Sequence, residues 1–446
     1  MSYEQAKNIT GVVYLLFLIY IIVSMKKYKN SPIIILLLVT IITPYNLLIS
    51  KIANYQETTY FTFLYRTKIS IFSLIDIYFF GIILIYFRKL LKIKTTKIIK
   101  IFLIRDIVYI IIGTVALILS KGYMIDNGRT YLGNMRGIIY IWGGYFLFSY
   151  FLYKNRDFKL QEVLNILIKL IIGSTLLSSL YKTGEIWTRF GRKVTILSQE
   201  WATFFIIFII VYFYFYNKFY QKNIKNKFYL VLMILIAYLN MYKGNLIYLV
   251  VFFIYISIFC TNFQITNFIK IYVLGLLSIA IILFFIVKFS DNIAINTRKL
   301  QYNQYIDYIE KREYTTLSYL IGGGIGSAYE GKMGDFGESY EIDRQKYGEY
   351  KFSLQTPILS NFKDVGILGV TFTLITNLYI LKTILQKNKR VIFIKKSNNK
   401  KYKFLMIGYF LTYNLVTLVV VMGVPSLSLF LGYLYAEYNK LLGEKI

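Results

Sequence analysis

Two arginines three positions apart, Arg189 and Arg192, stand beside Trp187 and Phe190 in a polar stretch that precedes an apolar run. The planar guanidinium group forms paired hydrogen bonds with phosphate and is only weakly hydrated. Basic and aromatic residues in such a place also anchor a chain among lipid headgroups. The spacing therefore indicates either a phosphate-binding pair or two interfacial anchors.

Carboxylates that are able to accept a proton gather in one long polar segment, residues 290–364. Glu338 and Asp343 lie in its tyrosine-rich part, and either is a candidate for a weak general base toward a hydroxyl group. Arg312 and Arg344 of the same segment are candidates for a second contact to phosphate. A solvated loop carries the same mixture of charges, so both interpretations stay open.

A glycine cluster, IGGGIGS, occupies residues 321–327 within this segment. Glycine adopts positive φ and allows close backbone approach, so the cluster either binds phosphate through its N–H groups or turns the chain. The overlapping stretch GSAYEGKM mimics a nucleotide-binding P-loop, but Met333 stands where Ser or Thr must hold magnesium. Nucleotide binding is therefore not expected.

Metal-ligand residue types are scarce, because the chain contains no histidine and a single cysteine, Cys260. Zinc sites are built mainly from histidine and cysteine, so none is expected, and one cysteine forms no intrachain disulfide. A catalytic base must be something other than imidazole. We expect no metal and no cofactor.

Three ionisable residues lie within or between apolar runs: Asp76, Lys169 and Lys243. Asp76 is expected about two turns into a membrane helix, where a charge is costly and indicates a function or a cation from another helix. Lys169 is long enough to reach the interface. Lys243 stands in the tight turn MYKGN. Asp76 and Lys243 are candidate substrate-binding residues.

The elements that must position these residues are apolar helices. The chain has 446 residues, of which 57% are hydrophobic, and they gather in runs of about 20, the length that crosses a membrane. The expected spans are 9–24, 32–50, 69–87, 101–120, 135–153, 163–180, 198–216, 228–241, 244–260, 270–288, 366–386, 404–422 and 425–440. The sequence thus predicts an all-α, polytopic integral membrane protein of about 13 helices. Residues 1–446 form a single membrane domain, with a large extracytoplasmic loop at 289–365.

Lysine and arginine set the expected orientation. A formal net charge of +30 would suggest nucleic acid in a soluble protein. Here the excess lies mainly in the loops after the first, third, fifth, seventh and eleventh runs, as the positive-inside rule predicts for the cytoplasmic side. Nucleic-acid binding is therefore not expected. The N-terminus is expected outside and the C-terminus in the cytoplasm.

The end of the large loop, IGGGIGS followed by SLQTPILSNFKDVGILGV, resembles the O-antigen ligase and Wzy-type polysaccharide polymerase superfamily. Members end their periplasmic loop with a Gly-x-Gly turn, a His-Asn-x-x-Leu-like stretch, and Glu-x-Gly-x-x-Gly entering the next helix. Asp364, Gly366 and Gly369 fit the last element, with Asp in place of Glu. The ligases carry a functional histidine in this loop. Gln355 lies about where that histidine would fall, which favours a polymerase.

The resemblance implies an enzyme of the bacterial inner membrane that is a metal-independent glycosyltransferase of O-antigen, capsule or exopolysaccharide synthesis. A growing chain on undecaprenyl pyrophosphate is transferred to a hydroxyl of a new lipid-linked repeat unit at the outer leaflet. The implied partners are the undecaprenyl-pyrophosphate-linked oligosaccharide, membrane lipid and a regulator of chain length.

Roles follow from this reaction. Arginine stabilises the charge on a leaving pyrophosphate without a metal. We expect Arg189 and Arg192 to hold the pyrophosphate and Arg312 or Arg344 to add a second contact. The remaining expectations are Glu338 and Asp343 as base candidates, Asp364 as the residue that orients the end of the loop, and Gln355, Lys243 and Asp76 as further substrate-binding positions.

Two rival functions remain. A ligase would move finished polysaccharide onto another acceptor, and the missing histidine argues against it. A lipid-linked oligosaccharide flippase would have charged cavities within the membrane, paired halves and short outer loops. The long outer loop and the lack of visible internal symmetry argue against a flippase.

Overall fold

The structure is a computed structural model. It describes residues 68–69, 72–119, 129–154, 160–180, 185–189, 192–196, 200–220, 223–240, 293–311, 314–330, 350–351, 354, 357–393, 398–416 and 425–443, with scattered positions among residues 12–36 and 252–256.

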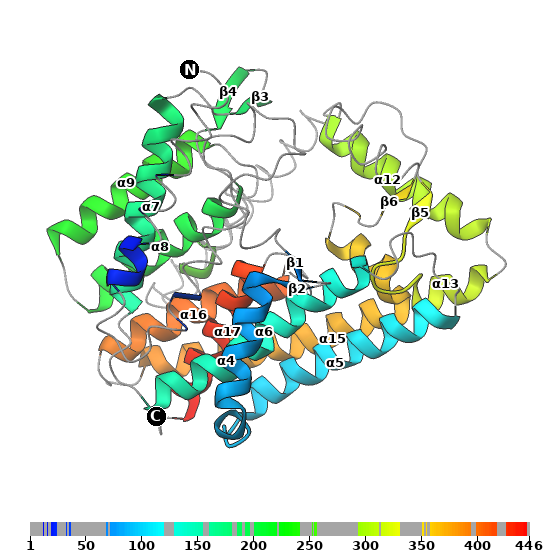
Figure 1. The fold of residues 1–446 in the computed structure, drawn as a ribbon, viewed down its shortest axis with the longest axis horizontal. Coiled ribbons are helices and arrows are strands. Elements are labelled where there is room, and N and C mark those ends of the chain that lie inside the picture. Colours follow the sequence, from blue (N-terminus) through cyan, green and yellow to red (C-terminus); the bar gives the residue numbers. More distant parts are fainter. Residues whose placement is uncertain are drawn as a thin grey trace, which may run out of the picture.

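Helices make up nearly all of the described chain, which confirms the all-α prediction (Figure 1). They are α4 (Leu74–Leu90), α5 (Lys97–Leu119), α6 (Arg129–Lys154), α7 (Leu160–Leu180), α8 (Glu200–Phe219), α9 (Ile224–Asn240), α12 (Ile293–Glu310), α13 (Thr315–Ile321), α15 (Pro357–Phe393), α16 (Asn398–Val416) and α17 (Pro425–Gly443). Three two-stranded antiparallel hairpins join them: β1 (Lys68–Ile69) with β2 (Phe72–Ser73), β3 (Glu185–Arg189) with β4 (Arg192–Ile196), and β5 (Tyr329–Glu330) with β6 (Tyr350–Lys351).

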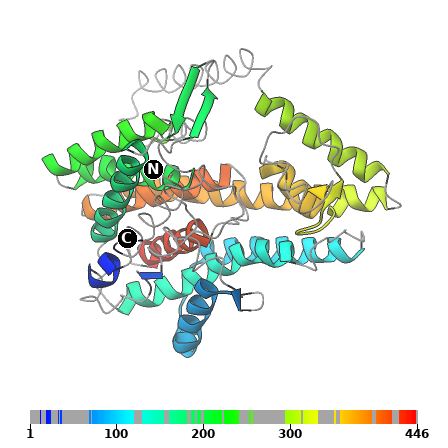
Figure 2. The ribbon, with the colours of Figure 1, turned by 45° about the horizontal axis from the view of Figure 1, so that its top comes forward.

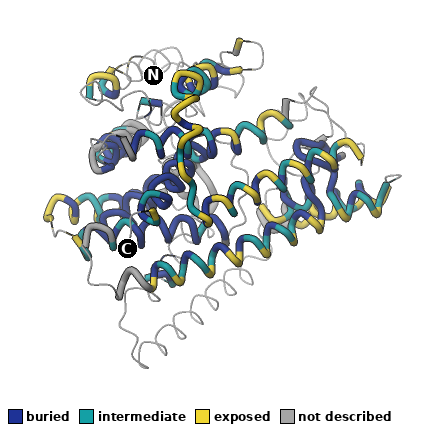
Figure 3. Tube along the Cα trace, turned by 90° about the horizontal axis from the view of Figure 1, so that it is seen from below, coloured by how far each residue is buried: buried dark blue, intermediate teal, exposed yellow. Residues whose placement is uncertain are grey.

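Helices α6 and α17 pack side by side at the centre, and their side chains are mostly buried (Figures 1 and 3). Glycine allows the close approach, because a Cβ on Gly432 of α17 would collide with the backbone of Ile141 and Tyr145 in α6. Lys440 Nζ donates to the carbonyl of Leu152 at 3.2 Å, so the carboxyl ends of the two helices lie together and the pair is parallel. Small residues at a helix contact are typical of membrane bundles.

Helices α5 and α15 form a second, antiparallel pair (Figure 2). Arg105 in the first half of α5 donates to Asn377 of α15, whereas Tyr109 one turn later donates to Asp364. Within α15 the backbone breaks at Gly366, with φ 62° and ψ −168°. The break separates a short segment before Gly366 from the long apolar helix after it.

Helix ends that the sequence assigns to the same side of a membrane meet in the structure. Thr96 N, before α5, donates to Asn439 Oδ1 of α17 at 2.8 Å, and Asn439 Nδ2 donates to the Lys94 carbonyl at 3.1 Å. These ends are all predicted to be cytoplasmic. At the opposite end, Ile325 of the polar segment donates its amide to Gly113 O near the end of α5.

Within the described residues, two helices are long and apolar enough to cross a membrane, Lys97–Leu119 and Pro357–Lys389. Two shorter helical stretches, Val163–Gly173 and Phe204–Phe219, are also apolar. The expected number of about 13 spans stays a prediction. Of the expected spans, 32–50, 244–260 and 270–288 fall mostly or wholly outside the described residues, and half of the span 9–24 does so.

The first part of the polar segment folds as α12 and α13. Tyr305 and Ile309 of α12 pack with Tyr329 and Leu354 in a small separate core. Leu300 of α12 is exposed. The polar segment therefore has an apolar centre of its own.

Candidate functional site

The glycine cluster IGGGIGS forms a turn that lies against the break in α15. Gly322, Gly324 and Gly326 have φ values of 84°, 96° and 73°, a region that favours glycine. Gly323 N donates to Lys363 O at 2.8 Å, and Ile325 N donates to Gly113 O at 3.2 Å. The turn is thus hydrogen-bonded to two helices, and the two motifs that the sequence singled out, IGGGIGS and KDVGILG, come together.

Lys363 and Asp364 form a buried ion pair beside this turn. Lys363 Nζ lies 2.6 Å from Asp364 Oδ1, and only 1% of the lysine side chain is exposed. Lys363 Nζ donates to Ser327 O at 3.0 Å. The hydroxyl of Tyr109 donates to Asp364 Oδ2 at 3.0 Å. Asp364 therefore joins Tyr109 of α5 to Lys363, which contacts the turn, and its expected role in orienting the end of the loop stays a prediction.

Close backbone contact explains why glycine occupies this site. A Cβ on Gly366 would collide with the amide of Gly322, and a Cβ on Gly324 would collide with Leu117 of α5. Any other residue would push the turn away from the helices.

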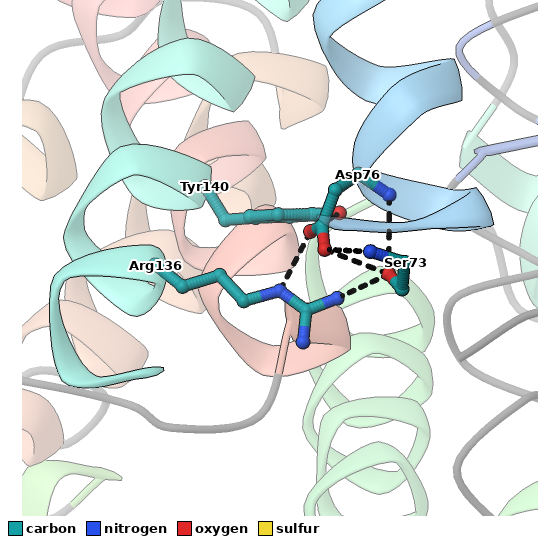
Figure 4. Close-up of polar contacts among 4 residues, drawn as sticks. All are labelled: Ser73, Asp76, Arg136 and Tyr140. Carbon is teal, nitrogen blue, oxygen red and sulfur yellow. Dashed lines mark hydrogen bonds and ion pairs between the residues drawn. The ribbon is translucent and has the colours of Figure 1, made fainter. Parts of the chain in front are cut away.

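Asp76 belongs to a second polar cluster, at the start of α4 (Figure 4). Ser73 is the N-cap of the helix and Asp76 is its third residue, so the two side chains form a capping box. Asp76 Oδ1 accepts hydrogen bonds from Arg136 Nε at 2.6 Å and from the Tyr140 hydroxyl at 2.9 Å. Asp76 Oδ2 accepts from Ser73 N and Ser73 Oγ. A carboxylate has about four acceptor sites, and all four are used.

This cluster corrects one sequence expectation and supports another. Asp76 lies in the first turn of α4, not two turns in, because Ser73 caps the helix and residues 68–73 form the β1–β2 hairpin. The expected cation from another helix is present, since Arg136 comes from α6. Arg136 is not among the candidate residues predicted from the sequence. The indication of it in the sequence is its position at the edge of an expected apolar run.

Arg105 and Asp106 form a third pair, deep within α5. Arg105 Nη2 lies 2.7 Å from Asp106 Oδ1, and the two side chains are 3% and 0% exposed. Trp142 of α6 donates to Asp106, and Arg105 donates to Asn377 of α15. The pair joins α5 to α6 and α15, which indicates a structural role.

Arg189 and Arg192 occupy directly opposed positions where the β3–β4 hairpin turns. Phe190 and Gly191 stand between them in the sequence. The two arginines are three positions apart in the sequence, and the pairing of the strands makes them direct neighbours. A phosphate-binding pair requires this proximity. The hairpin and α12 lie on the same side of the molecule, above α15 and α16 (Figures 1 and 2).

Eight expected site residues lie outside the residues whose side chains the structure describes: Arg189, Arg192, Lys243, Arg312, Glu338, Asp343, Arg344 and Gln355. Their roles stay predictions. Lys169 is exposed on α7 and donates to the Tyr20 hydroxyl at 2.7 Å.

Tyr329, two residues after the turn, is fully buried in the small core. Burial raises its pKa well above the ordinary value for a phenol, so the hydroxyl stays protonated at neutral pH. Among the described residues, no group of three His, Cys, Asp or Glu side chains is arranged to hold a metal ion.

Comparison with models of protein families, with curated proteins and with solved structures finds no match for this chain. The proposed function therefore rests on the residues of this chain and on their contacts.

Proposed function

We propose that this protein is a polytopic polymerase of the bacterial inner membrane, which joins undecaprenyl-pyrophosphate-linked repeat units into O-antigen, capsule or exopolysaccharide. The observation that carries the proposal is the meeting of the glycine turn with Lys363–Gly366. These are the two stretches on which the resemblance to the polymerase superfamily rests. Random similarity of two short motifs gives no reason for them to meet in one packed site.

The grouping of helix ends supports a membrane topology. Lys94, Leu152 and Asn439 belong to three segments predicted to be cytoplasmic, and hydrogen bonds join them. The glycine turn, the start of α15 and the end of α5 are all predicted to be extracytoplasmic, and they too are joined. In both groups, the contacts join helix ends that are predicted to lie on the same side of the membrane.

Exposed apolar side chains support burial in lipid. Leu84 and Ile85 of α4 are 73% and 74% exposed, Ile118 of α5 is 69% exposed, and Ile375 and Leu378 of α15 are 63% and 64% exposed. Soluble proteins rarely expose large continuous apolar surfaces. A bilayer would cover these side chains.

In the proposed reaction, the acceptor hydroxyl oxygen bonds to the anomeric carbon of the growing chain. The bond from that carbon to pyrophosphate breaks, and undecaprenyl pyrophosphate leaves. The hydroxyl proton passes to a loop carboxylate, Glu338 or Asp343. Arg189 and Arg192 stabilise the pyrophosphate charge as it develops.

A polymer ladder in the host tests this function. Deleting the gene should collapse surface polysaccharide to single repeat units, and the intact gene should restore the ladder. The double variant Arg189→Ala, Arg192→Ala should also give single repeats at an equal protein level. Lys193→Ala is the matched control, since it removes one positive charge from the same hairpin, and it should keep the ladder.

Other outcomes point elsewhere. Full ladders that accumulate on the carrier lipid after deletion would favour the ligase function. Loss of all repeat units from the outer leaflet would favour a flippase. A normal ladder in the arginine double variant would remove the pyrophosphate role from the hairpin.

A further inference from the structure

The glycine turn holds two backbone donors that have no acceptor. The amides of Gly322, Gly323, Ile325 and Ser327 donate to the carbonyls of Ser318, Lys363, Gly113 and Gly324. The amides of Gly324 and Gly326 donate to no acceptor in the part of the chain that the structure describes, although both residues are buried. Buried backbone N–H groups are nearly always paired, so these two indicate a ligand.

Lys363 fixes the conformation that leaves these donors free. Its carbonyl accepts from Gly323 N at one end of the turn, and its Nζ donates to Ser327 O at the other end. The hydroxyl of Tyr305 also donates to the Lys363 carbonyl, at 3.3 Å. One residue therefore holds both ends of the turn, and the small core of the polar segment holds that residue.

Burying the charge of a lysine costs desolvation free energy, so a lysine is an unfavourable residue for the sole purpose of holding a turn. Replacing a buried ion pair by apolar residues of similar volume is often neutral or stabilising, so the Lys363–Asp364 pair is not needed for stability alone. The positive charge beside the turn, with two free N–H groups and close backbone approach at glycine, matches the chemistry that recognises an oxyanion. Asp364 neutralises Lys363 but places its other oxygen toward Tyr109.

We propose that the turn at residues 322–327 binds a phosphate oxygen of the lipid-linked substrate, with the Gly324 and Gly326 amides as donors and Lys363 as the residue that positions them. The ligand class rests on the proposed function. The Gly324 and Gly326 amides are hydrogen-bond donors that lie near the positively charged Lys363, and this combination favours an oxyanion as the ligand. The site would act together with the arginine hairpin, which is also predicted to be extracytoplasmic.

Hydrogen–deuterium exchange of the full chain in detergent tests the site. The probes are undecaprenyl pyrophosphate and, as the matched control, undecaprenol, which has the same chain without phosphate. At ten times its dissociation constant, undecaprenyl pyrophosphate should slow exchange of peptides covering residues 320–328 roughly tenfold. Undecaprenol should not. Equal protection by both lipids, or by neither, would overturn the proposal.

Variants separate positioning from folding. Lys363→Met should abolish protection of the turn by undecaprenyl pyrophosphate, and Lys363→Arg should restore part of it. Lys382→Met, which changes an exposed lysine on the same helix, should behave as the unmodified protein. If Lys363→Met does not fold, Gly326→Ala takes its place, because the positive φ at that position disfavours alanine. Full protection in Lys363→Met would exclude the positioning role of Lys363. Full protection in Gly326→Ala would exclude the binding role of the turn.

The outcome is independent of the ladder experiment. Phosphate-dependent protection with no polymer ladder would keep the binding site and reject the polymerase. A ladder without protection of the turn would do the reverse.

Discussion

At the residue scale, one carboxylate joins two helices. Asp76 caps its own helix through Ser73 and binds Arg136 of α6, and the ring of Tyr140 stacks on Phe79 with centroids 4.2 Å apart. Because all four acceptor sites of Asp76 are used, its first role is to fix α4 against α6. Its expected part in substrate binding stays a prediction.

Asp76→Asn should destabilise the protein. Removing one partner of a largely buried ion pair leaves Arg136 without its counter-charge, which costs on the order of 3 kcal/mol. The measurement is thermal unfolding in detergent, followed by tryptophan fluorescence. Tyr140→Phe is the matched change, since it removes one hydrogen bond to the same carboxylate and should lower stability by only about 1 kcal/mol. Equal unfolding temperatures for Asp76→Asn and the unmodified protein would contradict this account.

At the element scale, glycines decide how closely helices approach. Gly432 faces the backbone of α6, whereas a Cβ on Gly81 of α4 would meet nothing within 4 Å. Gly432→Ala should separate α6 from α17 and lower the unfolding temperature. Gly81→Ala should be neutral or slightly stabilising, since alanine favours helix by about 1 kcal/mol over glycine. If Gly432→Ala is as stable as Gly81→Ala, the parallel α6–α17 contact is misplaced.

The sequence predicted the helices better than it predicted the ends of the helices and the contacts between them. Apolar runs located α5, α7, α8 and α17 within a few residues, because helix length and hydropathy are local properties. The Ser73–Asp76 capping box was legible in the sequence, but the apolar run that begins at residue 69 concealed it. The break at Gly366 and the pairing of Asp76 with Arg136 depend on contacts between distant segments. Those contacts lie beyond what spacing along the chain reveals.

At the scale of the whole molecule, the account requires two faces separated by a bilayer. Single cysteines introduced on a Cys260→Ala background test it with a membrane-impermeant maleimide. Lys299 lies within α12 and Lys311 directly follows it, and both are exposed. Lys299→Cys and Lys311→Cys should therefore react in intact spheroplasts. Lys92→Cys and Lys225→Cys, exposed in loops predicted to be cytoplasmic, should react only after permeabilisation. Labelling of all four positions in intact spheroplasts would reject the topology.

The predicted topology places the two arginines and the glycine turn toward the outer leaflet. A lipid-linked substrate would therefore meet the hairpin, the turn and the loop carboxylates from one direction. The resemblance singled out both the glycine turn and Asp364, but the contact between them comes from the structure. The identity of the catalytic carboxylate depends on residues outside the described part of the chain.

The most direct test of the polymerase is reconstitution. Purified protein in liposomes is mixed with lipid-linked single repeat units isolated from a strain that lacks the gene, and the products are separated on a gel. The account predicts a ladder of repeats and release of undecaprenyl pyrophosphate in step with each bond formed, both without added metal. Repeat units that remain single while the protein stays folded would contradict it.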